Sequence, residues 1–302
     1  MDLTTPTTRP DQPGKLPRLP STVDVPVTKV SGSTERDADD TLALEEPLEI
    51  RLAFDRQGAP TQQSISITMR TPGDDYELAL GFLFTEGIVQ RADDVAGVRH
   101  CGPPVGAQQL RNVVRVELRS GVAVDLGRLQ RHFYTTSSCG VCGKASIDAL
   151  EVVGLRRVGA ELFRVSTEVI HRLPAELRRA QAVFERTGGL HAAALFDAAG
   201  QLIALREDVG RHNAVDKLIG SQLLAGNVPL RDRLLLVSGR ASFELVQKAV
   251  GAGIPLMAAV GAPSSLAVEL AQRYGMTLLG FVRDDRFNVY CGRDRIISEP
   301  RA

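Results

Sequence analysis

Polar and apolar residues alternate with a period of two in several stretches of the first half of the chain, the pattern of half-buried strands. The alternating stretches are residues 48–52, 64–69, 112–118 and 122–124. A segment that opens with Thr71-Pro72-Gly73-Asp74-Asp75 and stops at Gly87 carries the capping residues and apolar spacing of a helix. The first half therefore predicts an antiparallel sheet with one helix.

The second half follows a different pattern, in which helical periodicity separates continuous apolar runs. Residues 147–152 and 213–219 are predicted as helical, and 174–187 as an amphipathic helix that ends at Gly188-Gly189. The predicted strands are residues 191–196, 201–206, 234–237, 256–260 and 277–282. Strands that are apolar throughout and alternate with helices are typical of α/β proteins with both sheet faces covered. We therefore expect an α/β C-terminal lobe beside an α+β N-terminal lobe.

Composition limits where this protein works. The 302 residues are 43% hydrophobic and carry 36 basic and 36 acidic side chains, so no overall field favours nucleic acid or an acidic membrane. Four cysteines are too few for a disulfide scaffold, and no apolar run is long enough for a signal peptide or membrane span, which favours a soluble cytoplasmic protein. Residues 1–42 are rich in proline and polar residues and are expected to be a disordered tail. The expected units are residues 1–42, 43–165 and 166–302.

The most chemically specific stretch is the loop 134–144, which contains the pair Cys139 and Cys142. Gly140 and Gly143 leave the backbone free to move the thiols, and Lys144 favours the thiolate. By itself a C-x-x-C pair also fits a redox pair, half of a zinc site or two small buried residues. The other two cysteines are isolated and the histidines are single, so no second pair of zinc ligands is present at finger or ribbon spacing.

Three loops follow the predicted parallel strands, at residues 238–242, 261–265 and 283–286. Ligands of α/β sheets bind at this end of the strands, where helix N-termini present free N–H groups. Two of the loops carry arginine, which suits phosphate, but neither G-x-G-x-x-G nor a P-loop motif occurs there. The dense polar segment 207–213 fits both a site and a helix cap, whereas His191 fits a core histidine better.

Six separated motifs, taken together, resemble the FdhD family of formate dehydrogenase accessory sulfurtransferases, from about residue 46 to the C-terminus. The motifs are residues 71–83, 138–144, 187–193, 206–217, 238–240 and 286–290. The resemblance implies a cytidine-deaminase-like three-layer core with a mixed sheet, and a homodimer. The chain departs from zinc deaminases because His191-Ala192-Ala193 lacks the glutamate of H-x-E, so no zinc is expected.

The resemblance also implies an activity: the chain accepts persulfide sulfur from a cysteine desulfurase and passes it to the molybdenum or tungsten bis(guanine dinucleotide) cofactor, its bound substrate, for formate dehydrogenase. By motif position, Cys139 would carry the persulfide and Cys142 would assist. The implied cofactor-binding residues are Phe281, Val282, Arg283, Arg286, Phe287, Asn288 and Tyr290, and the loop pattern adds Ser238, Gly239, Arg240 and His212. The alternatives are a cofactor-binding chaperone and a dithiol–disulfide oxidoreductase.

Overall fold

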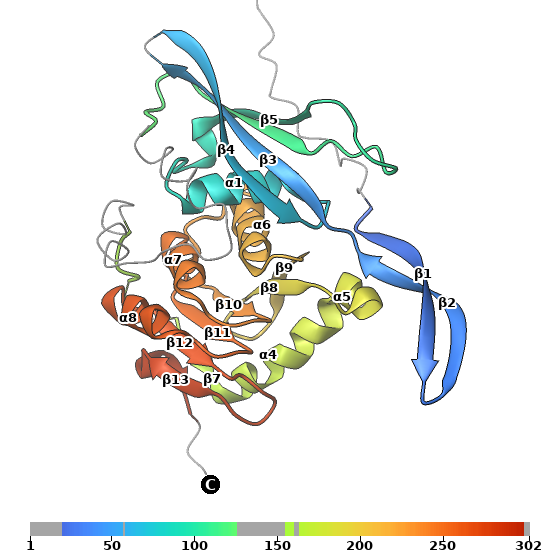
Figure 1. The fold of residues 1–302 in the computed structure, drawn as a ribbon. Helices are drawn as coiled ribbons and strands as arrows, with labels where there is room; N and C mark the ends of the chain where they lie inside the picture. The colour runs from blue at the N-terminus through green and yellow to red at the C-terminus, as the bar shows by residue number, and fades with distance from the viewer. Residues whose placement is uncertain (1–19, 57, 126–154, 160–162, 299–302) are drawn as a thin grey trace, which may run out of the picture.

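A six-stranded mixed sheet forms the centre of the computed structural model, which describes residues 20–56, 58–125, 155–159 and 163–298 (Figure 1). Its strands are β8 (His191–Phe196), β9 (Leu202–Asp208), β10 (Leu234–Val237), β11 (Leu256–Ala259), β12 (Thr277–Gly280) and β13 (Asn288–Cys291). The order is β13-β12-β11-β10-β8-β9, in which the neighbour pairs β10–β11 and β11–β12 are parallel and the other neighbour pairs are antiparallel.

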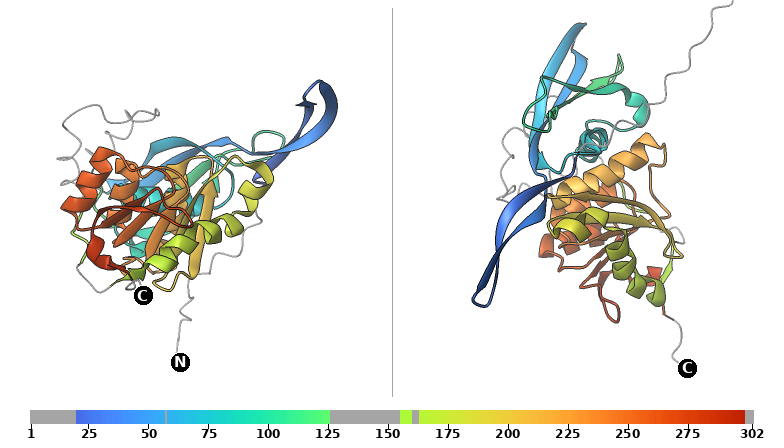
Figure 2. Two further views of the ribbon diagram at one scale, coloured as in Figure 1. Left: turned by 90° about the horizontal axis from the view of Figure 1, so that it is seen from below. Right: turned by 90° about the vertical axis from the view of Figure 1, so that its right-hand side faces the viewer.

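Helices cover both faces of this sheet and make a three-layer unit (Figures 1 and 2). One face carries α6 (Arg211–Leu224), α7 (Phe243–Gly251) and α8 (Ser265–Arg273), and the other carries α4 (Thr167–Ala180), which α5 (Ala182–Thr187) follows. In β8, Ala193 and Leu195 pack on the first face, whereas Ala192, Ala194 and Phe196 pack on the second. Burial on both faces explains the continuous apolar strands. The α/β fold class and the mixed sheet are confirmed.

A smaller lobe contains a second sheet and the helix α1 (Asp75–Thr85). The strands are β3 (Glu46–Arg56), β4 (Ala59–Arg70), β5 (Val95–Cys101) and β6 (Val113–Leu118), in the order β4-β3-β6-β5. Leu48, Ile50 and Leu52 point inward from β3 against α1. Short elements complete the described chain: the 3-10 helices η1 (Ala92–Asp94) and η2 (Arg293–Arg295), and the parallel pair β7 (Val165–Ser166) and β14 (Ile296–Ile297).

The two lobes meet where α1 lies against α6, and the backbones touch there (Figure 2). A Cβ atom at Gly81 would lie 1.8 Å from the carbonyl oxygen of Asp216, and one at Gly220 would lie 1.9 Å from that of Glu77. No side chain larger than hydrogen fits at either position. The glycine pair therefore sets the distance between the lobes.

Residues 22–43 form a long hairpin, which corrects the expectation of a disordered tail for this part of the chain. Strand β1 (Thr22–Ser31) pairs with β2 (Thr34–Ala43) over ten residue pairs. Val23, Val25 and Val27 alternate with polar residues, which is a strand pattern that the proline content conceals. Pro26 is tolerated because a two-stranded sheet consists of edges only. The rest of the expected tail, residues 1–19, lies outside the described residues.

Three further expectations differ from the structure. The helix predicted to start at Pro174 begins at Thr167, continues through Pro174, and is separated from α5 by Gln181. The sheet of the smaller lobe is mixed, because β3 and β6 are parallel. Residues 122–124 form no strand, since they follow a turn and pair with no neighbour among the described residues. The predicted helix at 147–152 lies outside those residues.

Candidate functional site

The loops after β10, β11 and β12 lie side by side at one edge of the large sheet. The backbone N–H of Gly261 donates to the carbonyl of Gly239 at 2.9 Å, and that of Phe281 donates to the carbonyl of Gly261 at 3.0 Å. Since β8 runs antiparallel to β10, its first residue, His191, reaches the same edge. The amide of Ala192 donates to the Ser238 hydroxyl at 2.8 Å, which fixes the first loop to β8. The expected assembly of the strand-end loops is therefore present.

Backbone strain marks the end of β12. Phe281 has a φ of 55°, a left-handed conformation that is rare outside glycine, and its side chain is 42% exposed. The preceding Gly280 has no room for a side chain, because a Cβ there would lie 2.8 Å from Pro263 Cδ and 2.9 Å from Tyr290 Cε2. Such strain costs on the order of 1–3 kcal/mol and clusters at functional sites. The strained turn presents an exposed aromatic ring at the edge.

Some of the remaining residues of the segment 281–290 are exposed at the edge, and others pack beneath it. Arg283, Arg286 and Asn288 are exposed, and Arg283 Nη1 donates to the carbonyls of Val260 and Val282 at 2.7 and 2.9 Å. The side chain of Val282, by contrast, is fully buried in the core, so it supports the loop and does not line its surface. Phe287 packs on the His171 ring of α4, with ring centroids 5.3 Å apart.

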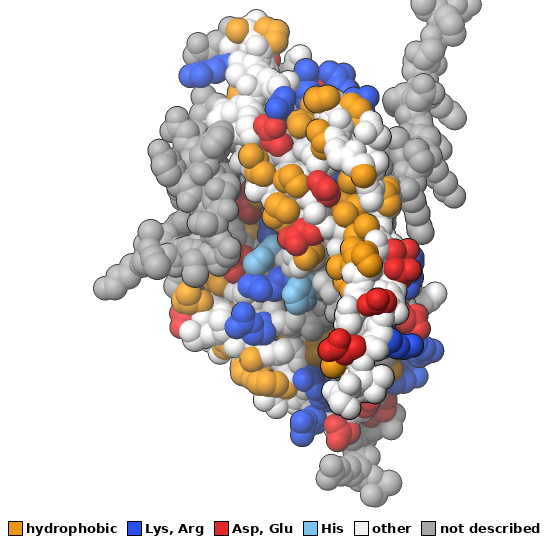
Figure 3. All heavy atoms as spheres, turned by 45° about the vertical axis from the view of Figure 1, so that its right-hand side comes forward, with side chains coloured by type: hydrophobic (Ala, Val, Ile, Leu, Met, Phe, Trp, Pro, Cys, Tyr) orange, Lys and Arg blue, Asp and Glu red, His pale blue; other side chains and the backbone are white. Residues whose placement is uncertain are grey.

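Two histidines reach this edge, one from β8 and one from α6. His212 Nε2 lies 3.4 Å from the Ser242 hydroxyl and 3.8 Å from a carboxylate oxygen of Glu244, both at the start of α7. The contact with His212 lowers the pKa of Glu244 to about 2. Burial, followed by the charges of Arg211 and His212, lowers the pKa of His191. Figure 3 shows histidine and basic side chains gathered beside apolar ones on this face.

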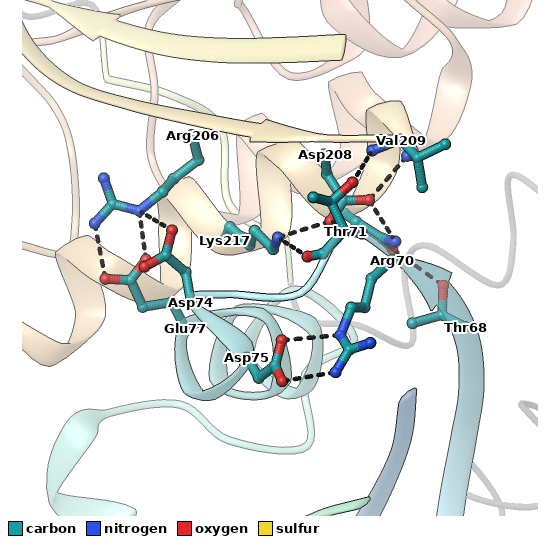
Figure 4. Close-up of polar contacts among 12 residues, drawn as sticks. Thr68, Arg70, Thr71, Asp74, Asp75, Glu77, Arg206, Asp208, Val209 and Lys217 are labelled. Carbon is teal, nitrogen blue, oxygen red and sulfur yellow. Dashed lines mark hydrogen bonds and ion pairs between the residues drawn. The ribbon is translucent and has the colours of Figure 1, made fainter. Parts of the chain in front are cut away.

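Most of the polar segment 207–213 is structural, and Figure 4 shows this for Asp208 with Lys217 and Thr71. Asp208 is fully buried, and its carboxylate lies 2.7 Å from Lys217 Nζ and accepts the backbone N–H of Thr71 at 3.1 Å. Asn213 donates to the carbonyl of Met69 at 2.7 Å. Glu207 accepts the N–H groups of the second and third residues of α5, at 3.1 and 2.9 Å. Asp208 and Asn213 therefore tie the lobes together, and Glu207 holds α5 within the larger lobe. Arg211 and His212 of this segment face the edge.

The edge is equipped to hold an anion. Neither Gly210 nor Ser242, the residues that precede α6 and α7, caps its helix through a side chain, whereas Ser264 accepts the N–H of Ala267 at the start of α8. The start of α6 therefore keeps N–H groups free of a side-chain cap. At the start of α7 the carboxylate of Glu244 hydrogen-bonds its own backbone N–H. Exposed arginines in the loops after β10 and β12, Arg240, Arg283 and Arg286, add positive charge. These features suit phosphate groups.

The thiol pair expected to be reactive, Cys139 and Cys142, lies outside the described residues. Of the described cysteines, Cys101 and Cys291 are both half-buried and free, and burial raises the pKa of Cys291. Within the ranges that the structure describes, no group of three or more His, Cys, Asp and Glu side chains is placed to hold a metal ion.

The sequence favoured a core role for His191, left the segment that contains Arg211 open between a site and a helix cap, and did not predict the strain at Phe281. His191 is the first residue of a predicted strand. Because β8 is antiparallel to β10, its first residue lies at the edge where the loops after β10, β11 and β12 meet. The sequence did not predict the left-handed conformation of Phe281, because this conformation is expected at glycine and not at an aromatic residue.

Comparisons with known proteins support the family assignment. The model of the FdhD/NarQ family matches residues 43–297. "Sulfur carrier protein FdhD" from Streptomyces avermitilis is 54% identical over 259 residues, covering 85% of this chain and 89% of that protein. The protein of the same name from Nocardia farcinica is 48% identical over 273 residues, covering 90% and 94%.

Solved structures agree with the sequence comparison. A crystal structure of a provisionally assigned formate dehydrogenase accessory protein from Desulfotalea psychrophila superposes with a TM-score of 0.69 at 25% identity, covering 92% of this chain and all of that one. Among the described helices, none is long and apolar enough to cross a membrane. The match of the family model over most of the chain, the identity to the two relatives and the shared fold show that the chain belongs to the FdhD/NarQ family.

Proposed function

We propose that this protein is a sulfur carrier that accepts persulfide sulfur from a cysteine desulfurase and transfers it to the molybdenum or tungsten bis(guanine dinucleotide) cofactor that formate dehydrogenase requires. In this proposal, Cys139 carries the sulfur and Cys142 assists. The relatives' name, sulfur carrier protein, supports the transfer of sulfur. The protein would act in the cytoplasm, as a homodimer.

The observation that carries the cofactor part of this proposal is the edge of the large sheet. It combines the start of α6, which has no side-chain cap, with exposed arginines and the exposed ring of Phe281. Phosphates would bind the N–H groups and guanidinium groups, and a guanine base would stack on an aromatic ring. A dinucleotide offers both chemistries, so the edge is a suitable seat for the nucleotide arms of the substrate.

Mass spectrometry tests the sulfur part. The reduced protein is incubated with an active cysteine desulfurase and free cysteine, and the Cys139–Cys142 peptide is examined for an added sulfur atom. We expect the addition in the wild type and its loss in Cys139→Ala. Cys291→Ala is the matched control, because that half-buried thiol donates to the Met276 carbonyl and its raised pKa disfavours the nucleophilic thiolate.

Three results would redirect the proposal. No added sulfur on the wild type, together with intact binding of guanine nucleotide, would favour a chaperone that carries finished cofactor and uses its cysteines for docking. Full formate dehydrogenase activity in cells that hold only the Cys139→Ala variant would point the same way. A dithiol oxidoreductase would instead show reversible oxidation of the pair at a potential that cellular reductants can reach.

A further inference from the structure

His191 occupies an unusual position at the candidate edge. It is the first residue of β8, opposite Asp208 of β9, and it packs on the loop after β10. A Cβ added to Gly239 would lie 3.4 Å from His191 Nδ1 and 3.5 Å from Cε1, so the ring lies flush with that glycine. The side chain is half-buried, and it makes no hydrogen bond with any residue that the structure describes.

The groups around the ring leave it without an anionic partner. Arg211 also contacts the loop after β10, since its Cδ lies 3.9 Å from the Cβ position of Gly239. The buried Nε of Arg211 has no hydrogen-bond partner among the described residues. Asp208, the acidic neighbour, is already engaged by Lys217, Asn213 and two backbone N–H groups. Glu244 faces His212. The positive charges near the ring therefore lack a free carboxylate.

We propose that His191 is a proton-accepting contact of the bound anion: it is a neutral imidazole in the free protein and takes up one proton from solvent when a phosphate of the nucleotide ligand binds beside it. This rests on the proposed seating of the guanine dinucleotide at the same edge. It assigns His191 as a ligand-binding residue that makes ligand affinity depend on pH.

The sign of the effect follows from the surroundings. In the free protein, burial and the charges of Arg211 and His212 keep the pKa of His191 below its ordinary value, and Asp208 offsets this only in part. A phosphate placed beside the ring reverses the balance, because an opposite charge favours the protonated form. Imidazole and one solvent proton become imidazolium, which donates a charge-assisted hydrogen bond. Above about pH 6, where the terminal phosphate stays largely ionised, binding therefore strengthens as the pH falls and weakens as it rises.

Isothermal titration calorimetry with GDP as the probe tests this directly. Titrations at pH 7.5 in buffers of different ionisation enthalpy give the number of protons taken up per GDP bound, at a pH where the terminal phosphate is already largely ionised. We expect net uptake by the wild type. His191→Asn and His191→Gln should show none, and should bind GDP roughly tenfold more weakly, as expected when one charge-assisted hydrogen bond is lost.

His212→Asn is the discriminating variant, because it removes the other imidazole at the edge and keeps His191. It should retain proton uptake. Uptake lost in His212→Asn but kept in His191→Asn would overturn the proposal, and so would GDP binding by the wild type without any uptake. If the His191 variants fail to fold, an NMR titration of the wild-type His191 Cε1 proton with and without GDP decides, since its pKa must rise on binding.

The outcomes separate this inference from the proposed function. GDP that binds without proton uptake refutes the role of His191 and leaves the nucleotide seat standing. GDP that does not bind at all refutes both the seat and the role of His191. The sulfur-loading experiment is independent of either result.

Discussion

The close approach of α1 and α6 makes a strong prediction about Gly220. Replacing it with alanine puts a Cβ 1.9 Å from the Glu77 carbonyl oxygen, whereas real contacts do not fall below 3.0 Å. The helices would have to separate by more than about 1 Å. The obstacle is helical backbone, which cannot rotate away as a flexible side chain would. Overpacking of this kind typically costs about 1–3 kcal/mol, and more where nothing can yield.

Separation of the helices would also stretch the polar contacts between the lobes. Glu77 of α1 forms two hydrogen bonds with Arg206, one of them at 2.7 Å from Nη2. Across the lobes, Asp216 of α6 accepts from Thr85 of α1 at 2.9 Å, and Lys248 of α7 donates to the Thr85 hydroxyl at 2.9 Å. Helix propensity works the other way and favours alanine over glycine by about 1 kcal/mol. We therefore expect Gly220→Ala to lose about 2–3 kcal/mol of unfolding free energy.

Thermal and urea unfolding measure this loss. For a chain of this length, 1 kcal/mol corresponds to roughly 2 °C in Tm, so a shift of about 4–6 °C is expected. Gly251→Ala is the matched control, because a Cβ at that helical glycine would meet only Leu155 Cδ2, at an ordinary 3.5 Å. It should be neutral or slightly stabilising. A Gly220→Ala protein as stable as the control would refute the account of how the lobes pack.

Asp75→Asn should cost about 3–5 kcal/mol in urea unfolding, because Arg70 is fully buried and would lose its carboxylate; a loss below about 1 kcal/mol would contradict this. Burial alone would raise the pKa of Asp75, but hydrogen bonds with His100 and Arg70 hold this pKa below its ordinary value. The contribution of Asp75 to stability is therefore complete above about pH 4, and it is lost as the pH falls through the pKa of the folded state. Acid unfolding followed by circular dichroism should therefore be shallower in Asp75→Asn than in the wild type, and parallel curves would show that another group dominates. Deletion of residues 1–43 should leave Tm nearly unchanged, because outside its own pairing the hairpin packs mainly on α5; a large drop would mean that the hairpin is part of the cooperative fold.

The central sheet was predictable because its strands are buried on both faces. The runs at 191–196 and 234–237 are apolar without interruption, and their boundaries match β8 and β10. The hairpin was not predicted, because its valines alternate with Asp24, Pro26 and threonines directly after a proline-rich stretch. Pro174 favours a predicted helix start at that residue, whereas the helix begins at Thr167. The periodic apolar residues Val169, Ile170 and Leu173 lie before that proline, and the Ser166 hydroxyl caps the helix by accepting the N–H of Val169 at 3.3 Å.

The candidate site shows why local sequence density is an ambiguous guide to function. The segment 207–213 is crowded with charged and polar side chains, yet Asp208 and Asn213 are used to hold β4 and α1 against the larger lobe. Buried polar groups must be paired, so a lobe interface demands such residues as strongly as a ligand does. His191 and Gly239, by contrast, are 48 positions apart and meet because β8 is antiparallel to β10. Strand order decides which residues share an edge, and that order is a property of the whole sheet and not of any one motif.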